Sequence, residues 1–340
     1  MDRVSRYILN NFFQTFLSLF LTLFFLASVV FFIKISQLTS VFNISFGDLF
    51  ESYLYVLPEI IVYTFPITFF ISVAMTIFKM SKDNETIVFF ALSLSPHKIA
   101  KVFFILSLGA TLILLLISLV LVPIAKQLNK NFINYKSMES KINIKATQFG
   151  QKFQDWHVFI NSSDKTTYSN LVLYNHKAKK DEERFILASE ATIDRNGSTI
   201  GFNLKNGKVF DFQAQEIRQI NYGGLELSYS PENKELNNES VLMYWTKALD
   251  NFKRAKNLSI NIFVSFFPLA TFLFGISFGV ANLRHEKPNI YLHIFIVVLL
   301  YYLLLYKVSS SFPFLGTPIV IIGFHLASAI YFREKILKRY

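Results

Sequence analysis

The stretch from Lys79 to Lys101 holds the residues whose types and spacing best support a specific interaction, between two long apolar runs. Asp83, Asn84 and Glu85 stand where a helix start needs acceptors and negative charge. An apolar group follows at once, made up of Ile87, Val88, Phe89, Phe90 and Leu92. The pattern predicts a short helix over about residues 83–93, with apolar surface for a groove and a charge to orient it. A solvated connector resting on lipid headgroups is the alternative interpretation.

Catalytic and metal chemistry find no support in the sequence. The nearest approach to a phosphate-binding loop, Gly201 to Val209, has the wrong glycine spacing and ends in Val209 instead of Ser or Thr. The six histidines lack metal-ligand spacing, and His325, alone among apolar residues, is predicted to be a neutral packed side chain. Cysteine is absent, which excludes disulfides and thiolate sites. We therefore predict a protein that is no enzyme and binds neither metal nor cofactor.

Hydropathy decides the class of protein. Of 340 residues, 52% are hydrophobic and 39 are Phe, and the apolar residues fall in blocks. Six segments without charge are each about long enough to cross a bilayer: Phe12 to Ile33, Ile60 to Phe78, Val102 to Ala125, Leu258 to Ala281, Ile290 to Tyr306 and Phe314 to Phe332. Ser95 and Pro96 predict the cap and first residue of the third spanning helix. The Ser and Thr residues of the spans are expected to bond within or between helices.

Ionisable residues are nearly absent from these spans. Coupling to an ion gradient generally needs charged side chains within the bilayer, and the spans offer only His325, with Glu59 near the edge of the second. Energy for any transport should therefore come from outside the chain.

The distribution of Lys and Arg predicts the orientation. The two termini, the 79–101 connection and the link between spans four and five carry twelve Lys or Arg, whereas the two short connections on the other side carry Lys34 and Lys307. Both termini are therefore predicted to be cytoplasmic. Most of the formal charge of +11 flanks apolar segments, which argues for membrane topology and against nucleic acid as a partner.

A soluble domain is inserted between the third and fourth spans, on the outer side. We predict three parts: residues 1–125 with three spans, 126–255 as the outer domain, and 256–340 with three more. Seven apolar runs alternate with polar residues: Trp156 to Ile160, Asn170 to Tyr174, Phe185 to Ile193, Thr199 to Leu204, Lys208 to Phe212, Ile217 to Ile220 and Leu225 to Tyr229. Asn196-Gly197, Asn206-Gly207 and Gly223-Gly224 predict hairpin turns between them. The fold predicted is an antiparallel sandwich or jelly roll, with helical stalks at Gln127 to Lys141 and Glu239 to Lys256.

Two cations and two glycines are further candidates. Lys34 and Lys307 lie on the cation-poor side, where they could contact phosphates of a lipid substrate or simply extend toward the interface. Gly275 and Gly279 form a GxxxG pair that allows close helix packing, although the motif is common by chance.

Several short motifs resemble a known family. They are Arg6-Tyr7, Leu57-Pro58-Glu59 with Pro66, Met80 to Glu85 leading to Ala91 to Ser95, and Asn282-Leu283-Arg284. With the order of three spans, β domain and three spans, they resemble the LptF/LptG permeases of the lipopolysaccharide exporter over nearly the whole chain. Phe89 and Phe90 are bulkier than the residues common there. The second span is similar to LptF, whereas Ile33-Lys34 and the Pro313 to Pro318 stretch are similar to LptG, so the paralogue stays open.

The resemblance implies a multi-pass protein of the bacterial inner membrane with a periplasmic β domain. The partners it implies are a cytoplasmic LptB-like ABC ATPase dimer, which uses ATP, a paralogous permease, a bitopic LptC-like β-fold protein and lipopolysaccharide. It also implies that the helix opened by Glu85 docks on the ATPase. Two other interpretations stay open, namely a different ABC-type permease or mechanotransmission protein, and a membrane-anchored envelope receptor or scaffold.

Overall fold

The computed structural model describes most of the chain. The described residues are 3–39, 45–91, 95–142, 151–153, 156–164, 167–179, 182–196, 199–212, 216–229, 239–280 and 289–338. They form two compact units, a helical bundle and a β domain, which we describe separately.

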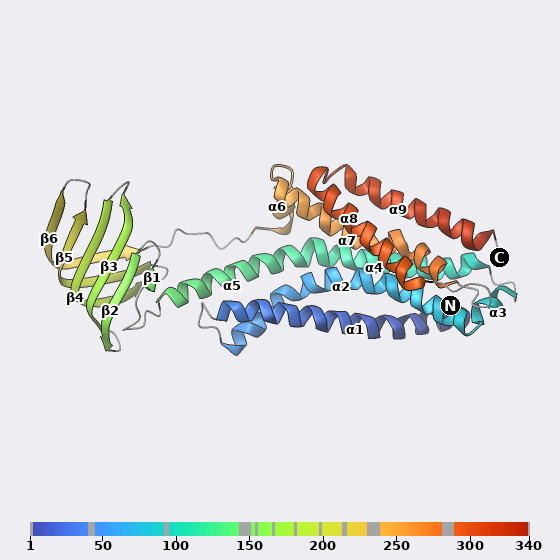
Figure 1. The fold of residues 1–340 in the computed structure, drawn as a ribbon, viewed down its shortest axis with the longest axis horizontal. Coiled ribbons are helices and arrows are strands. Elements are labelled where there is room, and N and C mark those ends of the chain that lie inside the picture. The colour runs from blue at the N-terminus through green and yellow to red at the C-terminus, as the bar shows by residue number, and fades with distance from the viewer. Residues whose placement is uncertain are drawn as a thin grey trace. The chain divides into compact units, whose positions relative to one another are not determined.

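The helices carry the predicted membrane spans. They are α1 (Arg3–Thr39), α2 (Phe46–Lys82), α3 (Glu85–Ala91), α4 (Pro96–Leu116), the π-helical turn η1 (Ile117–Leu121), α5 (Val122–Ile142), α6 (Val241–Thr246), α7 (Phe252–Gly279), α8 (Ile290–Ser311), α9 (Gly316–Phe332) and the π-helical turn η2 (Arg333–Leu337) (Figure 1). Six helical stretches of the described chain are long and apolar enough to cross a membrane, which confirms the predicted number. Each contains one of the predicted segments, or all of it except a terminal residue or two, because helices extend beyond the bilayer core.

Helix α7 is the centre of the bundle. It packs against α2, α4, α8 and α9, and its side chains are mostly buried. Phe267 stands between an aromatic ring of α2 and one of α8, with its centroid 5.7 Å from Phe70 and 4.8 Å from Tyr301. The hydroxyl of Tyr301 donates to the carbonyl of Phe263 at 2.8 Å, which satisfies a buried polar group on an otherwise apolar ring.

Helix α1 is held by a ladder of phenylalanines. Phe12 and Phe16, one turn apart, face α2, with ring centroids 5.3 Å from Phe69 and 5.0 Å from Phe65 respectively. The opposite side of α1 is exposed, as at Phe25, which is 62% accessible. In a bilayer such a surface faces lipid or another chain.

The β domain is one antiparallel sheet. Its strands are β1 (Gln151–Phe153), β2 (Trp156–Asp164), β3 (Thr167–Lys179), β4 (Glu182–Asn196), β5 (Thr199–Phe212) and β6 (Ile217–Tyr229). Each described strand pairs with its neighbour in the chain, in the order β1 to β6. An all-helical membrane bundle with an inserted antiparallel sheet is the predicted fold class, and it is confirmed.

The strand count differs from the prediction. The seven runs correspond to five long strands, and β1 was missed. A hairpin does follow Asn196, which pairs with Thr199. The turns predicted at Asn206-Gly207 and Gly223-Gly224 are wrong, because these residues lie within β5 and β6.

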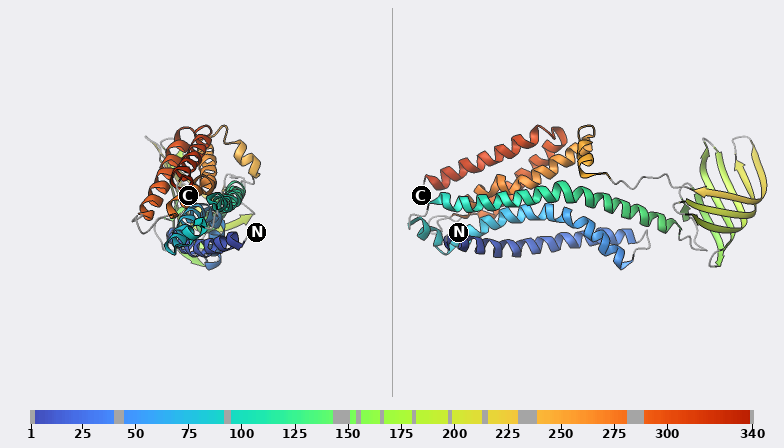
Figure 2. Two further views of the ribbon diagram at one scale, coloured as in Figure 1. Left: turned by 90° about the vertical axis from the view of Figure 1, so that its right-hand side faces the viewer. Right: turned by 180° about the vertical axis from the view of Figure 1, so that it is seen from behind.

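A crease across the sheet explains those two errors. The pairing skips one residue on each of four strands, Asn170, Ser189, Asn206 and Gly223, which stand opposite one another. Asn170 and Asn206 have left-handed backbones, with φ of 52° and 48°. Such residues shift the inward–outward alternation by one, so that Phe202 and Leu204 point to the core before the crease and Val209 after it. The strands bend there, and both halves contribute to one buried core (Figure 2).

The predicted stalks differ from each other. Gln127 to Lys141 is helical within α5. Glu239 to Lys256 is not a continuous helix: Ser240 caps α6, the chain turns, and Asn251 caps α7.

Candidate coupling site at the α2–α4 connection

The turn between α2 and α3 is set by a left-handed asparagine. Helix α2 ends at Lys82, and the amide of Asp83 still donates to the carbonyl of Lys79 at 3.0 Å. Asn84 then takes φ of 60°, which asparagine tolerates better than most residues. The sequence predicted helix from about residue 83. The described helix, Glu85–Ala91, is about two turns long, and residues 92–94 lie outside the described part of the chain.

A buried threonine fixes α3 to α2. Thr86 is 2% exposed, and its hydroxyl donates to the hydroxyl of Ser81 at 3.2 Å. Two hydroxyls that satisfy each other in an apolar environment resist separation, because either alone would be left buried without a partner. Helix α3 therefore moves with the end of α2.

Glu85 connects α3 to α1. The hydroxyl of Tyr7 donates to Oε1 of Glu85 at 2.7 Å. The other carboxylate oxygen is inaccessible to solvent and has no hydrogen-bond partner among the described residues. The carboxylate is therefore held by one donor and has acceptor capacity for another.

The apolar residues of α3 divide into two groups. Phe89 and Phe90 are partly buried and pack against the bundle's own core cluster, which includes Ile8 and Ile99. Val88 is 51% exposed, and the side chain of Ile87 lies outside what the structure describes. The sequence had assigned all four to one docking face.

An open groove runs beside α3. Its volume is about 430 Å³, and its lining includes Arg3, Tyr7, Asp83, Glu85 and Val88. Charges of both signs at the rim of an apolar floor suit recognition of a protein side chain or helix. No three His, Asp or Glu residues of the described chain lie close enough together to hold a metal.

The start of α4 follows the prediction. The hydroxyl of Ser95 accepts from the amide of His97 at 3.3 Å, and Pro96 is the first helical residue. Proline there sacrifices no hydrogen bond.

Lys34 and Lys307 lie apart from this site, on α1 and α8. Both are exposed, and neither forms an ion pair with a described residue. Glu59 does pair, since its carboxylate lies 3.2 Å from Nζ of Lys126.

Gly275 and Gly279 lie where α7 meets α2. A Cβ on Gly275 would lie 2.9 Å from Cγ1 of Val73, and one on Gly279 would lie 2.6 Å from Cβ of Ile77. Only glycine permits this approach of the two helices.

Sequence reasoning missed the polar contacts inside the bundle. Ser259 on α7 bonds to Ser309 on α8 at 2.8 Å and to Thr317 of α9 at 2.6 Å. His325 accepts from no described donor and lies 3.1 Å from the carbonyl of Leu269, consistent with a packed side chain whose Nδ1 donates. The abundance of Ser and Thr predicted such bonds in general, but no local signal identifies which helices pair.

One family model matches almost the whole chain. The model for the lipopolysaccharide export system permease LptF/LptG covers residues 6–332. The chain belongs to this family. Membership confirms the predicted resemblance and supports a role as an LptF/LptG permease in lipopolysaccharide export. No individual curated protein matches the sequence. The match spans Tyr7, α3 and the β domain, and with six apolar helices it indicates a multi-pass protein of the inner membrane.

Proposed function

We propose that this chain is the permease subunit of an ABC exporter that extracts lipopolysaccharide from the inner membrane, driven by a separate cytoplasmic ATPase that docks on α3. The observation that carries the proposal is that α3 is exposed on one side yet attached to three spans. Glu85 bonds to Tyr7 of α1, Thr86 bonds to Ser81 of α2, and Phe89 packs against a core that includes residues of α4.

This arrangement suits transmission of force. A partner that displaces α3 has to displace the ends of three helices with it, because the buried Thr86–Ser81 bond and the packed Phe side chains cannot be broken without cost. The spans hold no charged network for ion coupling, which agrees with energy supplied from outside.

The proposed orientation places both termini and α3 in the cytoplasm and the β domain in the periplasm. It rests on the distribution of Lys and Arg around the spans. The further partners we propose are a paralogous permease, which would cover exposed faces such as that of α1, and a bitopic protein of similar β fold.

The test is Glu85→Lys. An exposed charge at a helix start contributes about 0.3–1 kcal/mol, so the variant should fold and accumulate normally. We expect it to lose export in a strain depleted of the wild-type protein, and to retain less ATPase on purification. Glu334→Lys is the matched control, because Glu334 is exposed in η2 and pairs with Lys338 one turn away. Full export by Glu85→Lys at normal protein level would contradict the coupling role.

We also propose that Lys34 contacts a phosphate of the lipid substrate. Its ammonium is exposed and free of described partners, at the end of α1 distant in sequence from α3. A photocrosslinker at position 34 should give a lipopolysaccharide adduct that declines when ATP drives release. Adducts with phospholipid alone would exclude this contact. Lys307 is the corresponding candidate on α8, and the same experiment applies to it.

A further inference from the structure

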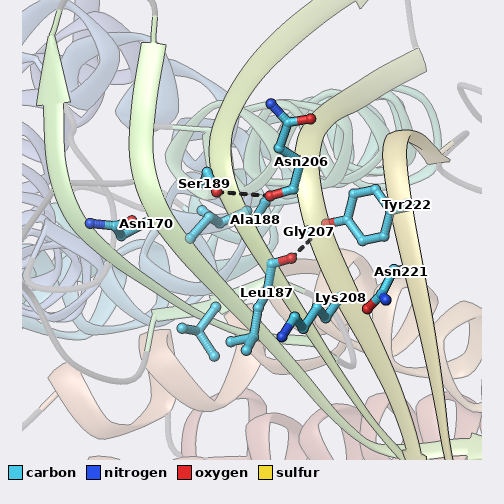
Figure 3. A pocket seen from close by; sticks show the side chains of 11 residues that line it. Asn170, Leu187, Ala188, Ser189, Asn206, Gly207, Lys208, Asn221 and Tyr222 are labelled. Carbon is cyan, nitrogen blue, oxygen red and sulfur yellow. Dashed lines mark hydrogen bonds between the residues drawn. The ribbon is translucent and has the colours of Figure 1, made fainter.

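A pocket lies on the crease of the β domain, away from every residue discussed above as a transport site. Its volume is about 540 Å³, within the range of ligand sites of drug-like size. Its polar lining comes from four strands and includes Asn170, Ser189, Asn206, Lys208 and Asn221 (Figure 3).

Two hydrogen bonds across the crease keep the pocket in shape. The hydroxyl of Tyr222 on β6 donates to the carbonyl of Leu187 on β4 at 2.7 Å, passing over Gly207 of β5. The hydroxyl of Ser189 donates to the carbonyl of Asn206 at 2.8 Å (Figure 3). Burial raises the pKa of Tyr222 above its usual value, so its hydroxyl stays protonated and remains a donor.

The carboxamides around the pocket are largely unused. Within the described residues, the side chains of Asn170 and Asn206 form no hydrogen bond, and both are exposed. Asn221 accepts from Gln219 at 3.0 Å through Oδ1, which leaves its NH₂ group to donate. A carboxamide offers a donor and an acceptor side by side, a good match for adjacent hydroxyls of a sugar.

Charge at the pocket has one sign. Lys208 is exposed and makes no ion pair with a described residue. None of the described lining residues is acidic. An ammonium beside free amides favours a ligand that carries both hydroxyls and an anionic group.

We propose that this pocket binds a phosphorylated or otherwise acidic saccharide, with Lys208 on the anion and the carboxamides of Asn206 and Asn170 on sugar hydroxyls. The proposal rests on the proposed export function for its biological source, the sugar part of lipopolysaccharide. A folded core of apolar side chains fills the inner face of the sheet, so the pocket offers the polar part of an amphipathic substrate a separate surface.

The experiment measures binding of fully deacylated, phosphorylated lipopolysaccharide oligosaccharide to the full chain in nanodiscs, without ATPase. We expect saturable binding that weakens as salt rises. Lys208→Gln and Asn206→Gly should each weaken it by about tenfold, the loss of one good hydrogen bond to a ligand. Glycine at position 206 keeps the left-handed backbone, so the fold is retained. Lys205→Gln is the matched control, an exposed lysine on the same strand outside the pocket.

Three results would overturn the proposal. They are no binding by the wild-type chain, equal affinity of all three variants, and full competition by inorganic phosphate alone, which would make it a simple anion site. The same oligosaccharide after dephosphorylation should bind less tightly, and unchanged affinity would remove the role of Lys208. Export that fails in Glu85→Lys while saccharide binding persists contradicts only the proposed function, whereas lost binding with normal export contradicts only this inference.

Discussion

The indole nitrogen of Trp245 donates a 2.7 Å hydrogen bond to the carbonyl of Leu119, across 126 positions of sequence. Leu119 lies in the π-helical turn η1, where the regular helical bonding of the third span is interrupted. The neighbouring carbonyl of Ser118 is satisfied by the amide of Asn261 at 2.9 Å. Two carbonyls of η1 therefore receive donors from α6 and α7, which explains how the turn is stable in an apolar bundle.

Trp245→Phe should destabilise the protein. It keeps an aromatic ring but leaves the carbonyl of Leu119 without its donor, at a cost of about 1–3 kcal/mol. We expect a lower thermal unfolding midpoint for the purified chain in nanodiscs. Tyr244→Phe is the control, because the Tyr244 hydroxyl forms no described hydrogen bond. An unchanged midpoint for Trp245→Phe would mean that the π-helical turn needs no external donor.

Gly279→Ala should separate α7 from α2. Its Cβ would lie 2.7 Å from the carbonyl oxygen of Ala74, a backbone atom that cannot yield like a side chain. Overpacking of this kind costs about 1–3 kcal/mol. Gly109→Ala is the matched control in α4, since nothing lies within 4 Å of its added Cβ, and alanine is favoured over glycine in helices by about 1 kcal/mol. Equal thermal midpoints of the two variants would contradict the close contact.

Gly207→Ala should disrupt the crease of the sheet. An added Cβ would lie far inside contact distance of both the Leu187 carbonyl and the Tyr222 hydroxyl, so the bond between them has to break. We expect the β domain to become susceptible to limited proteolysis while the helical bundle remains resistant. Gly224→Ala is the control on β6, where space around the added Cβ is open. Protection of Gly207→Ala equal to wild type would show that the crease tolerates a side chain.

Glu239 predicts a component of acid sensitivity outside the membrane. Hydrogen bonds from Lys247, at 2.5 Å, and Arg254, at 2.9 Å, hold the pKa of Glu239 below its usual 4.5. A carboxyl with a lowered folded-state pKa stabilises the fold above its unfolded pKa, and this is lost as pH falls through the folded value. We expect Glu239→Gln to be less stable than wild type at neutral pH, and the difference to shrink as pH falls below about 4.5.

Thermal midpoints measured across that pH range test this prediction. Glu226→Gln, an exposed residue of β6, is the control for the loss of one charge. A difference between Glu239→Gln and wild type that stays constant with pH would contradict the assignment.

Hydropathy was sufficient for the spans, because six uncharged apolar segments have few alternatives to membrane helices. Alternation located the sheet, but the crease shifts the inward-facing positions by one residue on each strand. β5 and β6 therefore each read as two strands, and Asn206-Gly207 read as a turn. The break between α6 and α7 was missed because no proline or glycine marks it.

The candidate site was predicted only in its local part. Asp83 to Phe90 showed the position of α3, and Ser95-Pro96 the start of α4. The bond from Tyr7 to Glu85 joins residues 78 positions apart, and the burial of Phe89 and Phe90 depends on how α1 and α4 pack. Such contacts follow from tertiary packing, which residue spacing does not encode.

Docking of an ATPase on α3 is the central claim, and photocrosslinking from position 88 in native membranes tests it most directly. Val88 is 51% exposed on α3 and lines the groove beside Glu85, so a photoreactive residue there reaches outward without disturbing the core. The account predicts an adduct with a soluble nucleotide-binding ATPase, and none from the same probe at Tyr291, which is 70% exposed on α8. Adducts from position 88 with lipid or with other parts of this chain, and none with an ATPase, would contradict it.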